Sequence, residues 1–188
     1  IEHLKGSFVY INKNDLKLQY ASVYEETENL SYYFSPGRIN VIGEHIDYNG
    51  GLVFPCAISL GTYAAVSLRE DDTVNLYSGN FPAVGVVSFK LSEVLTKDNL
   101  WTDYVKGVVS EIIKLGHKLD KGFNAYIIGN LPNGASLSSS ASLELLFCEI
   151  IREIHCLKLS DLDLVKISQG AENNFVGLHC GIMDQFAI

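Results

Sequence analysis

The sequence predicts an α+β domain, and three observations support that class. Short apolar segments bounded by turn residues fill the first ninety residues, as strands do. Later segments repeat apolar residues at helical spacing. Between those helices, an apolar run leads through a loop of small residues into another apolar helix, and this loop is the most distinctive stretch of the chain. A length of 188 residues is enough for one domain with a substantial core.

Composition narrows the range of partners and compartments. Hydrophobic residues make up 47% and charged residues 19%, which is typical of a soluble globular protein. The net charge of −8 argues against nucleic acid as the main partner, because nucleic acid requires a basic face. The four cysteines form no C-x-x-C pair and lie in apolar contexts, so we expect buried, reduced thiols in a cytoplasmic protein. The chain has no signal-peptide pattern, starts without methionine and stops within an apolar phrase, so we expect a fragment of a longer protein.

The first elements are a helix and a strand. Apolar residues at helical spacing predict a helix over Asp15 to Tyr24, with Asn12 or Asn14 as its N-cap. The segment Ser31 to Phe34 predicts a short strand.

A charge-free run from Leu52 to Leu68 raises the question of a membrane span, which requires about 20 mainly apolar residues. Pro55 and Gly61 interrupt this shorter run, and the sequence favours two buried strands joined near Gly61. Thr73 to Tyr77 and Val84 to Phe89 continue the strand pattern. We therefore expect an antiparallel sheet in the first ninety residues.

The second half of the chain is predicted to be mainly helical. Trp101 to Leu115 has the clearest amphipathic pattern. An apolar strand, Phe123 to Ile128, precedes the small-residue loop, and the apolar helix Leu143 to Ile154 follows it. The sequence Ser160-Asp161-Leu162-Asp163 resembles a capping box and predicts a further helix through Phe175.

A polar motif between the turn signals at Ser35 to Gly51 is the first candidate site. Arg38, Glu44, His45 and Asp47 stand within ten residues, and the residues between them are core-like. Carboxylates accept hydrogen bonds from sugar hydroxyls, and histidine can donate or accept. The pattern favours a sugar or polyol site, and a structural arginine–carboxylate network is the alternative.

The small-residue loop, Asn130 to Ser142, is the second candidate. A helix that starts after such a loop presents unpaired N–H groups and a positive dipole end to an anion. Three residues lack bulk and would let a phosphate approach: Gly134, Ala135 and Ser136. Three hydroxyls could bond phosphate or a metal: Ser138, Ser139 and Ser140. The loop has neither a Walker lysine nor a Rossmann glycine pattern, and a serine-rich helix cap remains the alternative reading.

Further candidates lie in the predicted helices and near the end of the chain. Trp101 and Tyr104 share the first turn of their helix and are either core aromatics or a platform for a purine. Glu172 lies close to an apolar helix face. Asp184 stands between Met183 and Gln185, where poor solvation would make it a candidate base.

Three motifs in order resemble the GHMP family of small-molecule kinases. G-R-I-N-V-I-G-E-H-I-D-Y, Gly37 to Tyr48, is similar to the sugar signature of the galactokinase branch. L-P-N-G-A-S-L-S-S-S-A-S is similar to the family's phosphate loop. A-E-N-N-F with C-G-I-M-D-Q resembles the segment that carries a metal-binding Glu and a catalytic Asp, and W-T-D-Y-V-K-G-V resembles the adenine-side helix.

The resemblance implies transfer of the γ-phosphate of ATP to the C1 hydroxyl of α-D-galactose, with Mg²⁺ as a cofactor. Asp184 would take or orient the hydroxyl proton beside Arg38, and whether it acts as a full base or as an electrostatic partner stays open. The implied sugar-binding residues are Glu44, His45, Asp47, Gly181 and Asp184. The implied nucleotide-binding residues are Trp101, Tyr104, Gly134, Ala135, Ser136, Leu137, Ser138, Ser139 and Ser140, and the implied metal ligands are Ser140 and Glu172.

The resemblance also implies that residues 1–188 form the N-terminal domain of a two-domain fold, a mixed sheet packed with helices like domain 2 of ribosomal protein S5. The C-terminal domain and the third glycine-rich motif would be absent, so this chain alone should be inactive. Ser136 departs from the family, which usually has glycine there. Other readings are a sugar and ATP sensor with little turnover, a kinase for a related sugar such as N-acetylgalactosamine, and a non-catalytic structural domain.

Overall fold

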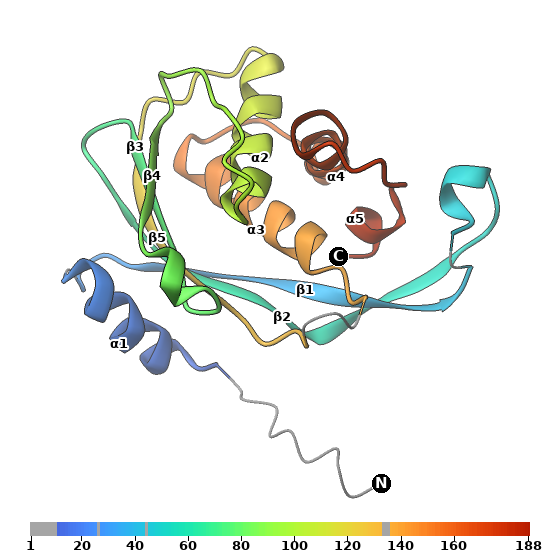
Figure 1. Ribbon diagram of the computed structural model, residues 1–188, viewed down its shortest axis with the longest axis horizontal. Coiled ribbons are helices and arrows are strands. Elements are labelled where there is room, and N and C mark those ends of the chain that lie inside the picture. The colour runs from blue at the N-terminus through green and yellow to red at the C-terminus, as the bar shows by residue number, and fades with distance from the viewer. Residues whose placement is uncertain (1–10, 26, 44, 133–135) are drawn as a thin grey trace, which may run out of the picture.

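A mixed sheet separates one N-terminal helix from the remaining helices of the chain (Figure 1). The computed structural model describes residues 11–25, 27–43, 45–132 and 136–188. The strands are β1 (Ser31–Ile42), β2 (Phe54–Leu68), β3 (Thr73–Ser78), β4 (Val87–Lys90) and β5 (Phe123–Gly129). The α-helices are α1 (Lys13–Tyr24), α2 (Thr102–Lys114), α3 (Ser139–Ile154), α4 (Asp161–Gly170) and α5 (Met183–Ala187). Short 3₁₀ turns at Asp47–Asn49 and Pro82–Val84 and a π-helical turn at Ala171–Val176 complete the described elements.

The five strands follow the order β1-β2-β5-β3-β4. Strand β5 pairs antiparallel with β2 and parallel with β3. The expectation of an antiparallel sheet within the first ninety residues is therefore only partly correct, because β2 and β3 are not neighbours. Strand β5 is buried through most of its length, so its apolar side chains fit the centre of the sheet and not an edge.

The predicted break in the second strand is wrong. Strand β2 runs unbroken from Phe54 to Leu68, and Gly61 lies opposite an irregular step of β1 between Pro36 and Arg38. A Cβ atom at Gly61 would lie 2.1 Å from the carbonyl oxygen of Ser35. Glycine is therefore needed here for close approach of two strands and not for a turn.

Strand β1 also extends beyond its predicted end at Phe34, because it continues into the polar motif as far as Ile42, before His45 and Asp47. Together, β1 and β2 form a long ribbon that projects past the helices (Figure 1). Within the described ranges, no helix is long and apolar enough to cross a membrane.

Helix boundaries agree best where a cap is encoded in the sequence. The Asn12 side chain accepts hydrogen bonds from the N–H groups of Asn14 and Asp15 at the start of α1. Both halves of the capping box predicted at Ser160 and Asp163 are present at the start of α4. Helix α3 begins at Ser139, earlier than the predicted Leu143, because the serine run itself forms the first turn.

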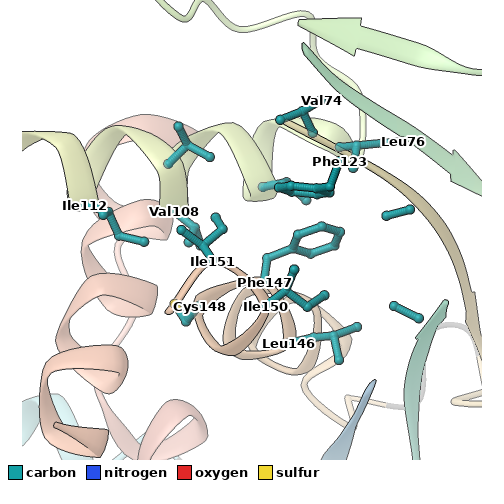
Figure 2. Packing of buried hydrophobic residues seen from close by; sticks show 14 of the residues in the cluster. Val74, Leu76, Val108, Ile112, Phe123, Leu146, Phe147, Cys148, Ile150 and Ile151 are labelled. Carbon is teal, nitrogen blue, oxygen red and sulfur yellow. The ribbon is translucent and has the colours of Figure 1, made fainter. Parts of the chain in front are cut away.

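The main core lies between the sheet and helices α2 and α3 (Figure 2). The rings of Phe123 on β5 and Phe147 on α3 stack with centroids 6.1 Å apart. On the opposite sheet face, Tyr20 of α1 packs in a second cluster. All four cysteines are free, but Cys56 and Cys156 are exposed, so the expectation of buried thiols is wrong for these two.

Candidate functional site

One cavity of about 660 Å³ collects the polar motif of β1, the serine loop and the last helix. These three segments are far apart in sequence, and the sheet and helix α3 bring them together. The lining residues are Arg38, His45, Asp47, Tyr48, Leu131, Pro132, Ser136, Leu137, Ser138, Ser139, Ser140, His179, Cys180, Gly181, Met183 and Asp184.

Two of the lining residues, Arg38 and Asp184, form an ion pair. Arg38 Nε donates to Asp184 Oδ1 at 2.8 Å, and Nη2 lies 2.7 Å from the same oxygen. Ser138 Oγ donates to Asp184 Oδ2 at 2.5 Å. The Arg38 side chain is 7% exposed and that of Asp184 is 32% exposed, so the carboxylate is more solvated than the sequence suggested. Charge-assisted contacts on both oxygens hold it in place.

The serine loop is joined directly to β1. The Leu137 carbonyl accepts from the Arg38 backbone N–H at 3.2 Å, and the Ser136 carbonyl accepts from Arg38 Nη1 at 2.6 Å. Ser136 and Ser138 both have left-handed backbones, with φ of 52° and 58°. Gly134 and Ala135, which the sequence also assigned to the phosphate site, lie outside the described residues.

The start of α3 forms part of the cavity wall. Ser138 is the N-cap residue, but its side chain makes no capping hydrogen bond, since the hydroxyl donates to Asp184. The first-turn residues Ser139 and Ser140 line the cavity. Unpaired N–H groups and the positive helix end favour an anion at this position.

A buried hydroxyl fixes this helix start against the sheet. Ser142 Oγ donates to the carbonyl of Ser35 on β1 at 2.8 Å and lies 2.9 Å from Thr62 Oγ1 on β2. The position of the serine loop is therefore set by β1, which also carries Arg38, and by β2.

The sugar-type motif continues from β1 into the loop beside α5. The Asp47 carboxylate accepts from the backbone N–H of Met183 at 3.1 Å. A Cβ atom at Gly181 would lie 1.7 Å from Asp47 Oδ2, so this position requires glycine. His45 is exposed and lines the cavity. Glu44 lies outside the described residues.

A second cavity of about 190 Å³ adjoins the first along the N-terminal turn of α3. It contains Trp101 and Tyr104, and it shares Leu131, Ser139 and Ser140 with the larger cavity. Burial raises the pKa of Tyr104, with the charges of Glu172 and Glu144 adding to the effect. A flat group stacked on Trp101 or Tyr104 would thus lie next to an anion bound at the first turn of α3.

Sequence reasoning missed other residues of this second cavity. They are Thr62, Ser78, Asn80, Phe81, Ile127, Gly129 and Leu143. The turn S-G-N-F-P after β3 offered a signal, since a polar residue directly after a buried strand lies at a sheet end.

The structure does not bring Glu172 into either cavity. Its Oε2 atom accepts from Cys180 Sγ at 3.0 Å and from Gln185 Nε2 at 2.9 Å. Burial raises the pKa of Cys180 to about 12, and the hydrogen bond to Glu172 adds to that rise. Ser140, the other expected metal ligand, lines both cavities. Among the described residues, no group of three or more His, Cys, Asp or Glu side chains is arranged to hold a metal.

Comparison with known proteins gives matches along most of the chain. Residues 19–68 match the galactokinase galactose-binding signature, and residues 103–188 match the GHMP kinases N terminal domain. A galactokinase of Clostridium perfringens is 54% identical over 162 residues, which are 86% of this chain and 42% of the relative. A galactokinase of Lactiplantibacillus plantarum is 51% identical over 95% of this chain and 46% of its own length.

Solved structures of kinases are also similar to this chain. The Lactococcus lactis galactokinase in complex with galactose is 48% identical, with a TM-score of 0.90 over 93% of this chain and 45% of that one. The mevalonate kinase of Methanococcus jannaschii is 18% identical with a TM-score of 0.72, which shows a shared fold alone. The chain thus spans less than half the length of the curated relatives that it matches.

Proposed function

Because this chain belongs to the galactokinase family of GHMP kinases, we propose that its protein transfers the γ-phosphate of ATP to the C1 hydroxyl of α-D-galactose. The observation that carries this proposal is the Arg38–Asp184 pair, which lies in one cavity with the sugar-type motif and the start of α3. Residues 1–188 would be the N-terminal domain of that kinase. Family membership itself implies the use of ATP.

We place the sugar at the end of the larger cavity that contains Asp47 and Gly181. Carboxylate oxygens of Asp47 and Asp184 would accept from sugar hydroxyls, and His45 would add a further polar contact. Glu44 would join them. The galactose complex of the Lactococcus lactis relative supports this choice of sugar. A cavity of about 660 Å³ also has room for a phosphate chain next to a hexose.

We place the nucleotide along the serine loop and the smaller cavity. Backbone N–H groups and hydroxyls from Ser136 to Ser140, together with Gly134 and Ala135, would bind the phosphates. Trp101 and Tyr104 would border the adenine. This arrangement points the phosphate end of ATP toward Asp184, because both cavities meet at Ser139 and Ser140.

The chemistry then follows from charge and position. A sugar hydroxyl is a weak nucleophile, and the Asp184 carboxylate can accept or orient its proton. The Arg38 guanidinium keeps that carboxylate in place and supplies positive charge beside the reacting phosphate. Phosphoryl transfer depends mainly on alignment and charge stabilisation, and a buried arginine tied to the serine loop provides both.

Oxygen donors of the chain suit Mg²⁺, which prefers hydroxyl, carboxylate and phosphate oxygens. Ser140 would be the ligand from the cavity wall. The Glu172 carboxylate lines neither cavity and accepts from Cys180 and Gln185, so it would become a second oxygen donor only on exchanging these hydrogen bonds for the ion. Mg²⁺ would neutralise phosphate charge during transfer.

The four free cysteines support a cytoplasmic location, because reduced thiols are typical of that compartment.

An ADP-release assay tests the proposal. The full-length protein is assayed with galactose, glucose, N-acetylgalactosamine and mevalonate. The proposal expects kcat/KM for galactose to exceed that for each other acceptor by at least about tenfold. If N-acetylgalactosamine were turned over faster than galactose, that sugar would be the proposed substrate. If the protein bound ATP and galactose without turnover, it would be a sensor.

Substitution of the proposed base gives a first prediction. Asp184→Asn in the full-length protein keeps the side-chain shape but cannot accept the proton, so galactose affinity should stay within about threefold while kcat falls by about a hundredfold or more. Calorimetric titration with galactose and the ADP-release assay measure the two effects. Near-normal turnover of this variant would remove Asp184 from the catalytic role.

A further inference from the structure

Two asparagine side chains hold the serine loop where it leaves the sheet. Asn80 follows β3, and Asn130 is the first residue after β5. Each side-chain amide pairs with the backbone of a neighbouring segment at the level where regular strand pairing ends. Asn80 belongs to none of the motifs that carry the sugar or phosphate assignments, and Asn130 is the first residue of the small-residue loop.

Asn80 extends the β3–β5 pairing by one step. Regular pairing ends at Ser78 and Ile127, and the N–H of Gly79 still donates to the carbonyl of Ile127 at 2.8 Å. Asn80 Nδ2 then donates to the carbonyl of Gly129 at 2.9 Å, and its Oδ1 accepts from the N–H of Gly129 at 2.6 Å. The side-chain amide of Asn80 thus makes the two hydrogen bonds to Gly129 that a backbone N–H and C=O of a longer β3 would make.

Asn130 does the same on the opposite side of β5. Regular pairing with β2 ends at Thr62 and Gly129. The backbone N–H of Asn130 donates to the Gly61 carbonyl at 3.1 Å, and its Oδ1 accepts from the Gly61 N–H at 2.8 Å. The end of β5 is therefore fixed from both neighbouring strands.

We propose that Asn80 is a positioning residue for the nucleotide phosphates and acts through Gly129 on the serine loop. This inference rests on the proposed function, in which the loop binds the phosphates of ATP. The other end of the loop is fixed by Ser142 of α3, whose hydroxyl contacts Ser35 on β1 and Thr62 on β2. Both ends of the loop are therefore held to the sheet. Release of the Gly129 end would let the loop shift relative to Arg38 and lose its alignment.

Asn80 also lines the smaller cavity, so a direct contact with the base is the rival explanation. The two explanations differ in which ligand they affect. A positioning role weakens binding of ligands that carry phosphates and leaves adenosine unaffected. A direct contact with adenine weakens adenosine and ATP alike.

The test uses Asn80→Ala in the full-length protein, with Asn75→Ala as the matched control. Asn75 lies on β3, the strand that Asn80 follows, and its side-chain amide donates to Asn124 at 2.8 Å, away from both cavities. Dissociation constants for ATP, adenosine and galactose are measured by calorimetric titration or competition. Asn80 is exposed, so its loss should leave the melting temperature close to that of the control.

We expect Asn80→Ala to raise the dissociation constant for ATP by about five- to tenfold. The dissociation constants for adenosine and galactose should change by less than about twofold. Asn75→Ala should leave all three constants unchanged. Equal weakening of ATP and adenosine, or no change for ATP, would overturn the inference. Asn80→Ser, too short to span both Gly129 groups, replaces the alanine variant if that variant unfolds. A wild-type protein that binds no ATP would instead overturn the proposed function, and the inference with it.

Discussion

At the scale of single residues, two serines of one loop share a conformation and differ in their contacts. Ser136 and Ser138 both have positive φ, which costs a non-glycine residue about 1–3 kcal/mol. The Ser138 hydroxyl is bonded to Asp184, whereas the contact seen for Ser136 is made by its backbone carbonyl. A glycine at each position should relieve similar strain with different functional effects.

Ser136→Gly in the full-length protein should therefore raise the melting temperature and lower the KM for ATP, with little change for galactose. Ser138→Gly is the control: it relieves the same strain, but it should lower kcat because Asp184 loses a hydrogen bond. Thermal unfolding and steady-state kinetics measure both effects. If Ser136→Gly weakened ATP binding, its hydroxyl would be a phosphate ligand.

Glu144 makes stability depend on pH. It is fully buried on α3 and accepts from Ser168 Oγ at 2.6 Å. Burial raises its pKa from 4.5 to about 9, and the charge of Glu172 adds to the rise. Between these values the folded protein holds a proton that the unfolded chain releases, so stability falls as pH rises through this window.

Glu144→Gln should remove that dependence and stabilise the protein by about 1–3 kcal/mol near pH 8. Melting temperatures of the full-length protein between about pH 5.5 and 8.5 test this, because the window lies below the raised pKa. Glu149→Gln is the matched control, since Glu149 lies on the same helix with a side chain that is 43% exposed. An unchanged slope in Glu144→Gln would contradict the role of burial.

At the scale of elements, charged groups hold the loop before α2, the helix whose N-terminal end carries Trp101 and Tyr104 of the second cavity. Asp103 accepts from the backbone N–H groups of Asp98 and Asn99 at 3.0 and 2.8 Å. Lys106, whose side chain is 5% exposed, pairs with Asp98 and donates to the Thr96 carbonyl. These contacts fix the segment that leads directly into Trp101.

Lys106→Met should loosen this segment and raise the KM for ATP by about three- to tenfold, while the KM for galactose stays constant. Methionine keeps the buried stem of the side chain but loses the charge. Lys114→Met is the control on the same helix, because Lys114 pairs with Glu111 through a side chain that is 56% exposed. Equal changes in both KM values would show a general loss of stability instead of a local effect on Trp101.

Elements with local signals could be predicted, and long-range pairings could not. The caps at Asn12 and Ser160 and the amphipathic pattern of α2 depend on neighbours in sequence, and all three appear in the structure. The continuity of β2 through Gly61 depends on close contact with β1, which no local pattern encodes. The insertion of β5 between β2 and β3 is likewise a matter of tertiary packing.

The candidate site shows the same division. Arg38, the serine run and Asp184 stood out because polar groups in apolar settings are costly without partners, and the structure brings them together. The S-G-N-F-P turn marks Asn80 only as a polar residue at a sheet end, and an asparagine after a strand is typical of turns. Its role becomes visible only when β3 and β5 are seen side by side.

At the scale of the whole molecule, the ribbon of β1 and β2 projects past the described helices (Figure 1). It carries exposed apolar side chains. Val41 is 59% exposed, Ile42 is 70% exposed and Phe54 is 63% exposed, and Phe186 on α5 is 70% exposed. Exposed apolar side chains of this kind, when contiguous, mark a surface that associates with another protein segment. The relatives, which are more than twice as long as this chain, have further residues that could cover it.

The 188-residue chain by itself should therefore form no galactose 1-phosphate and should associate as its concentration rises. Light scattering follows association, and the ADP-release assay with the full-length protein as positive control follows activity. Ile42→Thr should reduce association, whereas Leu68→Thr, at the other end of the ribbon and 59% exposed, should not. Turnover by the isolated chain would contradict this prediction. It would mean that the residues around Arg38 and Asp184 align ATP and sugar by themselves, without the further residues that the longer relatives have.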